Sequence, residues 1–81
     1  MPRQSIKTDQ DGRLRKLGAA IRAARLERCL SQEVLADAAG IDRSHFGKIE
    51  RGERNVSVLN VARVATALGL SVAALTASAG I

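Results

Sequence analysis

The chain is divided into short segments by a repeated pair of signals, a polar capping residue at the start and a glycine at the end. A Ser or Asp side chain before an apolar segment can accept a hydrogen bond from a free backbone N–H group and begin a helix, and glycine readily adopts the left-handed turn that ends one. The capping residues are Ser31, Asp42, Ser57 and Ser71, and the glycines are Gly40, Gly52 and Gly69. This punctuation predicts an all-α chain, since no segment alternates as a strand would.

Helical spacing of the apolar residues predicts five helices, over residues 13–29, 32–39, 43–51, 58–68 and 72–75. With 81 residues the chain has room for one small core, which must be aliphatic because it contains a single Phe and no Trp or Tyr. We therefore expect a compact five-helix bundle. The expected organisation is a flexible N-terminal arm over residues 1–12, a folded domain over 13–77 and a frayed C-terminus over 78–81.

The charge balance favours an anionic partner. Thirteen Lys and Arg residues against eight Asp and Glu give a net charge of +5, and residues 13–29 carry six basic residues but only one acidic residue. One Cys and one His exclude an internal disulfide and a closed zinc site, and no nucleophile or phosphate-loop motif indicates an enzyme. No export signal or membrane-spanning segment is recognisable. We expect a cytoplasmic, nucleoid-associated protein that needs no metal or cofactor.

Residues 32–51 have the spacing of a helix-turn-helix, two short helices joined by a four-residue junction around Gly40 and Ile41. The second of these helices can lock onto the core through Phe46 and Ile49, which share one face. Its other face is polar, with the residues Arg43, Ser44, Gly47, Lys48 and Arg51. A helix with such a face fits the major groove of double-stranded DNA.

The stretch LSQEVLADAAGIDRSHFGKIERGERNVS resembles the Cro/C1, or XRE-type, helix-turn-helix family of phage repressors and bacterial regulators, and the resemblance covers about residues 14–75. Within that family, DRSHFGKIERGERNVS is similar to restriction-modification controller proteins. The resemblance implies a lambda-repressor-like fold and a transcription regulator that binds double-stranded DNA. Cys29 departs from the family, which often has glycine at this helix end.

Matching positions of the family imply roles for individual residues. Base contacts are implied for Arg43, Ser44, Gly47 and Lys48, with a guanine as the expected target of Arg43. Phosphate contacts are implied for Gln32, Arg51, Arg54 and Asn55. A structural ion pair is implied between Arg25 and Glu50. Gly47 has two interpretations, because a glycine within a helix either allows close approach to DNA or is only a tolerated weakness.

The apolar residues of the last two helices exceed what one small core easily buries. A homodimer would bury the excess, and the expected interface residues are Val61, Val64, Val72 and Leu75; alternatively, these residues complete the core of the monomer. The leading hypothesis is therefore a homodimer on a palindromic operator, with an additional contact to RNA polymerase. The second hypothesis is an antitoxin-like or adaptor protein whose apolar segment 72–81 docks onto another protein.

Overall fold

The computed structural model describes Asp9 and residues 11–81, and the helices within them confirm the predicted fold class. These helices are α1 (Arg13–Glu27), α2 (Gln32–Ala39), α3 (Arg43–Glu50), α4 (Val58–Leu68) and α5 (Val72–Ala79). The described part of the chain contains no strand. The flexible arm predicted for residues 1–12 lies mostly outside the described residues, although Asp9 accepts hydrogen bonds from the backbone N–H of Leu14 at 3.0 and 3.1 Å and so helps to begin α1.

All four predicted capping residues cap a helix in the structure. Each side-chain oxygen accepts a hydrogen bond from the backbone N–H three residues later, at 2.9 to 3.2 Å. The acceptors are Ser31 for α2, Asp42 for α3, Ser57 for α4 and Ser71 for α5. Gly40 ends α2 with a φ of +70°, a conformation that a side chain would disfavour. These local hydrogen bonds set the lengths of helices that are too short to persist alone.

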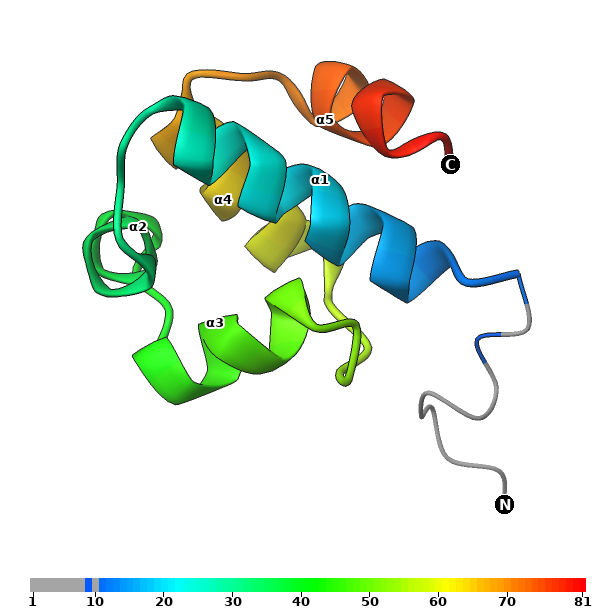
Figure 1. Cartoon of the computed structure of the whole chain (residues 1–81), viewed down its shortest axis with the longest axis horizontal. Coiled ribbons are helices and arrows are strands. Elements are labelled where there is room, and N and C mark those ends of the chain that lie inside the picture. The colour runs from blue at the N-terminus through cyan, green and yellow to red at the C-terminus, as the bar shows by residue number, and fades with distance from the viewer. Residues whose placement is uncertain (1–8, 10) are drawn as a thin grey trace.

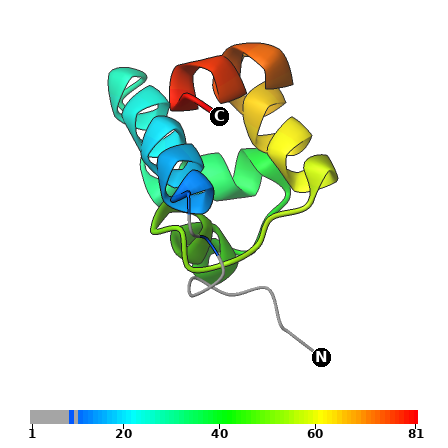
Figure 2. The ribbon, with the colours of Figure 1, turned by 90° about the vertical axis from the view of Figure 1, so that its right-hand side faces the viewer.

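Helix α1 lies between α5 on one side and α3 on the other (Figure 1), and Figure 2 shows it along one side of the molecule, across from α4. Helix α2 packs against both α3 and α4. The far end of α1 is tied to the end of α4 by Arg28, whose Nε donates to the backbone carbonyl of Leu68 at 2.8 Å. This arrangement leaves α3 on the opposite side of the molecule from α5 (Figure 1).

The core is aliphatic around one aromatic ring, as the composition predicted. Its largest fully buried side chains are Phe46, Ile21, Leu35, Ile49, Leu75 and Val64. Helices α1 and α3 approach so closely at Gly18 that a Cβ atom there would overlap the backbone carbonyl groups of Ile49 and Glu50. The position of α3 relative to α1 is therefore fixed by backbone contact as well as by side-chain packing.

The predicted dimer interface is wrong for three of its four residues. Val61 is 8% exposed, and Val64 and Leu75 are fully buried, so these side chains complete the core of the monomer and offer no surface to a second copy. Val72 is partly buried and packs against that core. Val61, Val64 and Leu75 therefore follow the second alternative, completion of the monomer core, because α4 and α5 turn these side chains inward.

The C-terminal end of α5 also differs from the prediction. Instead of losing its helical structure after Leu75 and fraying from residue 78, the chain stays helical to Ala79, and Gly80 ends it with a φ of +78°. Thr76 supports this turn, because its Oγ1 donates to the carbonyl of Val72 at 2.9 Å and its own carbonyl accepts from the N–H of Ile81 at 3.1 Å.

No single helix of the described residues is long and apolar enough to cross a membrane. Helices α4 and α5 reach the required length and composition only as a pair, and they are bent by 96° relative to each other. Both also bury core residues, which accounts for their apolar character.

Candidate nucleic-acid interface

Helix α3 has one face in the core and the opposite face in solvent. Phe46 and Ile49 are buried on the inner face. Arg43 and Ser44 are exposed in the first turn of the helix, and Lys48 is half-buried one turn later. The structure thus presents the predicted base-contacting residues Arg43, Ser44 and Lys48 on a helix whose other side is held by packing.

A buried ion pair joins α1 to the end of α3. The Nε of Arg25 donates to Oε2 of Glu50 at 2.7 Å, and Nη2 donates to Oε1 at 3.2 Å. The side chains of Arg25 and Glu50 are only 9% and 2% exposed. The remaining nitrogen, Nη1, donates to the carbonyl of Leu30 at 2.9 Å, so the guanidinium also holds the turn between α1 and α2. The structure confirms that this predicted pair is formed and shows that it links three elements.

Gln32, a predicted phosphate contact, has a structural bond of its own. Its Nε2 donates to Oε1 of Glu50 at 2.8 Å, so α2 is connected to the same carboxylate that binds Arg25. The side chain is partly exposed at the start of α2. Glu50 therefore fixes both the angle between the two motif helices and the orientation of the Gln32 amide.

Arg51 ends α3 and folds back over it. Its Nε and Nη2 donate to the carboxylate of Glu53 at 3.0 and 3.2 Å. The hydrogen bond from Arg51 lowers the pKa of the Glu53 carboxyl, and the same bond raises the pKa of the guanidinium. Nη1 lies over Gly47, 3.2 Å from where a Cβ would be. Gly47 is buried in this structure beneath the Arg51 side chain, and a base contact by Gly47 stays a prediction.

The loop after α3 is anchored on the beginning of α1. Gly52, with a φ of +72°, lies so close to the backbone of Arg15 that no side chain would fit there. Arg54 and Asn55 follow in the same loop and are exposed, as predicted phosphate contacts must be. Glu53 and Arg15 were not among the contacts predicted from the sequence. An ion pair between Arg51 and Glu53 could have been predicted, because the acidic residue follows the basic one by only two positions.

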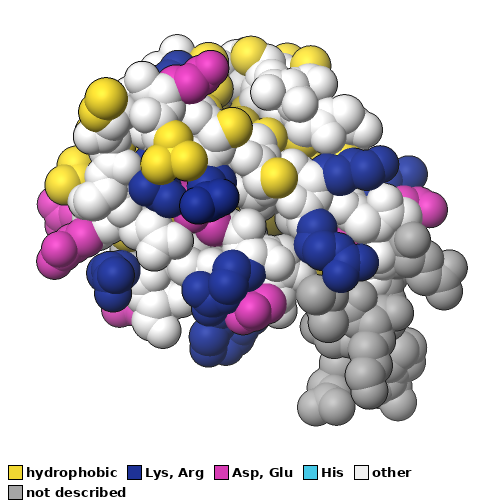
Figure 3. Space-filling model, viewed as in Figure 1, with side chains coloured by type: hydrophobic (Ala, Val, Ile, Leu, Met, Phe, Trp, Pro, Cys, Tyr) yellow, Lys and Arg dark blue, Asp and Glu magenta, His cyan; other side chains and the backbone are white. Residues whose placement is uncertain are grey.

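Basic side chains lie on this part of the surface as well as higher on the same face (Figure 3). Figure 3 shows Lys and Arg side chains along the lower margin of the molecule, where α3 and the loop after it lie, with acidic side chains between them. Hydrophobic side chains are more evident on the upper part of this view, toward α5. The margin that contains α3 is therefore the side of the molecule better suited to an anionic partner.

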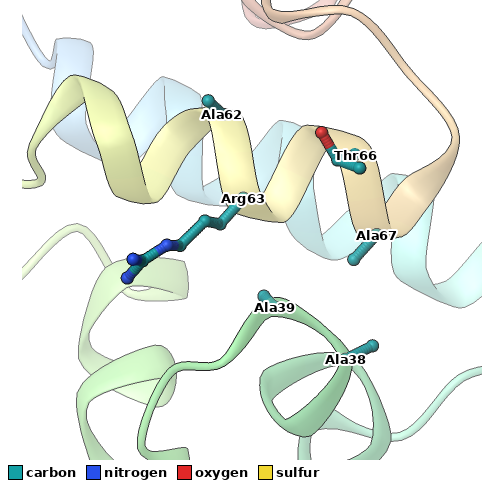
Figure 4. Close-up of a pocket in the computed structure, with 6 residues that line it drawn as sticks. All are labelled: Ala38, Ala39, Ala62, Arg63, Thr66 and Ala67. Carbon is teal, nitrogen blue, oxygen red and sulfur yellow. The ribbon is translucent and has the colours of Figure 1, made fainter.

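A shallow hollow of about 280 Å³ lies between α2 and α4 (Figure 4). Most of the side chains that line it are small; the lining residues are Ala38, Ala39, Ala62, Arg63, Thr66 and Ala67. In Figure 4 the long side chain of Arg63 extends away from Thr66 and Ala67. Within Asp9 and residues 11–81, no group of three or more His, Cys, Asp or Glu residues is placed to hold a metal ion. The exposed face of α3, which carries Arg43, Ser44 and Lys48, is the candidate site.

Comparisons with known proteins agree with this geometry. The sequence pattern of the helix-turn-helix family matches residues 21–75. The control protein C.MunI of a Mycoplasma species is 34% identical over 61 residues, which are 74% of this chain and 82% of that protein. The immunity repressor of Bacillus phage phi105 is 42% identical over 59 residues, 73% of this chain but only 41% of the repressor.

A solved structure shares both the fold and much of the sequence. The crystal structure of the restriction-modification controller protein C.AhdI from Aeromonas hydrophila has a TM-score of 0.75 and 47% identity, over 76% of this chain and 94% of that one. The relatives named here are control proteins and a repressor, and none of these names describes an enzyme. The chain therefore belongs to the helix-turn-helix family of the XRE type and is a DNA-binding regulator of the controller and repressor type.

Proposed function

We propose that the protein is a sequence-specific transcription regulator that binds a palindromic operator as a homodimer. One observation carries the proposal: α3 exposes Arg43 and Ser44 in its first turn while its inner face is fully buried and its end is fastened to α1. A helix that is fixed in this way can enter the major groove without losing its orientation. Such rigidity is what base-specific contacts require.

The two kinds of contact have different functions. Arg43 makes two hydrogen bonds to O6 and N7 of a guanine, and Ser44 and Lys48 contribute weaker base contacts. Gln32, Arg54 and Asn55 hold phosphates on either side of the groove, and this places α3 without reading sequence. The positive net charge adds an attraction that is independent of sequence and decreases with salt.

The proposed homodimer interface uses a different apolar surface from the one predicted from the sequence. Val58 and Leu59 at the start of α4 are 78% and 60% exposed, and they are adjacent in the chain. A second copy related by a two-fold axis would cover them, because a two-fold interface places the same patch on both sides. Two α3 helices would then reach successive turns of the major groove, about 34 Å apart.

The adaptor hypothesis is less well supported. Its docking segment was the apolar stretch 72–81, but the structure folds this stretch as α5, with Leu75 fully buried against the domain. Leu75, the largest apolar side chain within α5, is therefore not available to a partner. Binding to an operator also accounts for the location that we propose, on the nucleoid in the cytoplasm. A contact with RNA polymerase stays a prediction.

Selection from a randomised pool of DNA duplexes tests the proposal. At about 0.15 M salt nonspecific binding is weakened, and we expect enrichment of an inverted repeat with a guanine in each half-site. Arg43→Ala should relax the preference at that guanine, whereas Arg54→Ala should weaken all duplexes alike and reduce the salt slope by about 0.9. A pool that shows no enrichment with the wild-type protein would exclude sequence-specific regulation.

A further inference from the structure

Arg51 occupies the outer face of α3 although it lies at the end of that helix. Its side chain runs back by one turn, so that Nη1 is 3.2 Å and Cζ 4.0 Å from the position that a Cβ on Gly47 would have. Gly47 belongs to the same face as Arg43 and Ser44, which are four and three residues before it. The absence of a side chain at Gly47 therefore makes room for a guanidinium in the middle of the predicted recognition surface.

Glu53 fixes the direction in which this guanidinium points. The carboxylate accepts from Nε and from Nη2, so it occupies one edge of the planar group. Nη1 donates no hydrogen bond within the described part of the chain, and Nη2 keeps a second hydrogen on the edge that it shares with Nη1. Arg51 thus keeps a second pair of parallel donors while its orientation is already set.

We propose that Arg51 is a second base-reading residue, seated on Gly47 and positioned by Glu53, and not a phosphate contact. This inference rests on the proposed DNA-binding function. A phosphate group can be held by the planar fork of an arginine or by the point charge of a lysine, so a phosphate contact does not require a pair of parallel donors. The O6 and N7 atoms of guanine lie in one plane and need two parallel donors in that plane. An arginine with one edge bound by a carboxylate is suited to the second task.

The proposal also accounts for Gly47 itself. Glycine in the middle of a helix is unfavourable relative to alanine, and the contact with Arg51 gives the reason for keeping it. An alanine would place its Cβ 3.2 Å from Nη1 and displace the guanidinium by a few tenths of an ångström. Alanine at this position should therefore favour the helix but disturb the reading of the base.

The test uses the same duplex selection with Arg51→Ala, Arg51→Lys and Glu53→Gln. Lysine keeps the positive charge but lacks the planar pair of donors. We expect both Arg51 variants to lose at least about 5-fold of discrimination at one base pair per half-site, distinct from the pair read by Arg43. Glu53→Gln should weaken discrimination at that same base pair, and it should have no further effect when Arg51 is already alanine.

Glu27→Gln is the matched control, because Glu27 lies beside Arg28 at the far end of α1, with a side chain that is 77% exposed. It removes the same charge, so any general gain in attraction to DNA appears in both glutamine variants. If Arg51→Ala weakens all duplexes equally and leaves the base preference unchanged, Arg51 is a phosphate contact and the proposal is wrong. If Glu53→Gln binds the selected duplex more tightly than Glu27→Gln does, Glu53 competes with DNA, which also overturns the positioning role.

The outcome for the wild-type protein separates this inference from the proposed function. Enrichment by the wild type without the change at a second base pair rejects only the role of Arg51. Failure of the wild type to enrich any duplex rejects the proposed function. Circular dichroism of each variant measures whether the helices are intact. We expect no loss of helix, because all the substituted side chains lie at the surface.

Discussion

The pair formed by Arg25 and Glu50 should be the most sensitive point of the domain. Replacing Arg25 by methionine leaves a carboxylate that is 2% exposed with only the Gln32 amide as a partner. Removing one member of a buried pair costs about 3–5 kcal/mol, since the remaining charge is desolvated and uncompensated. That is a large part of the about 5–15 kcal/mol by which a typical domain is stable. Each kcal/mol lowers the midpoint of thermal unfolding of so small a domain by about 4–8 °C.

The double variant makes the reasoning testable. In Arg25→Met the buried charge of Glu50 is the problem, so adding Glu50→Gln should recover part of the lost stability, whereas two independent losses would add. Urea unfolding followed by circular dichroism gives the free energy of unfolding for the two single variants and the double variant. Glu27→Gln, which removes an exposed partner of Arg28, should change the stability by no more than about 1 kcal/mol.

Two results would refute this account. Either a loss below about 1 kcal/mol in both single variants, or a double variant that is less stable than both, would show that burial does not dominate the energetics of this pair. DNA binding by the single variants has to be measured where they are folded. Otherwise a structural defect would be mistaken for the loss of a contact with DNA.

Three further predictions concern stability and assembly. Cys29 has a φ of +56°, so Cys29→Gly should raise the free energy of unfolding by about 1 kcal/mol in thermal or urea unfolding, and a loss would show that the thiol has favourable contacts. Gly18→Ala should lower the free energy of unfolding by about 1–3 kcal/mol or more, because the added Cβ would overlap the backbone of α3. Alanine is the better helix former, so a stabilised variant would show that α1 and α3 can separate freely. Leu59→Glu should convert the proposed dimer to a monomer in sedimentation, whereas the control Leu26→Glu, at a residue that is 51% exposed, should not. Equal behaviour of both variants would place the interface elsewhere.

The parts of the fold that depend on local chemistry could be predicted from the sequence. The four helix caps involve residues only three positions apart, and each was identified from residue type and position. The outer residues Arg43 and Ser44 followed from the spacing of Phe46 and Ile49 on the inner face. The pair between Arg25 and Glu50 was identified only through resemblance, because nothing local connects residues that are 25 positions apart.

Other features depend on how the helices are oriented in space. Periodicity placed Val61 and Val64 on one face of α4, but it did not show whether that face meets the core or a second copy; the structure shows the core. The end of α5 was missed because its small residues give a weak apolar pattern, although alanine is the best helix former. The direction of the Arg51 side chain follows from the room above Gly47, which a sequence pattern does not show.

The contact between α1 and α5 joins the two ends of the folded domain (Figure 1). During synthesis α1 emerges first, and it remains without one of its two main packing partners until Leu75 has been made. Contacts between distant parts of a chain form late, because closing a long loop has an entropic cost. Helix α3 is made much earlier but is fastened to α1, so the packing around its support is complete only when α5 has docked.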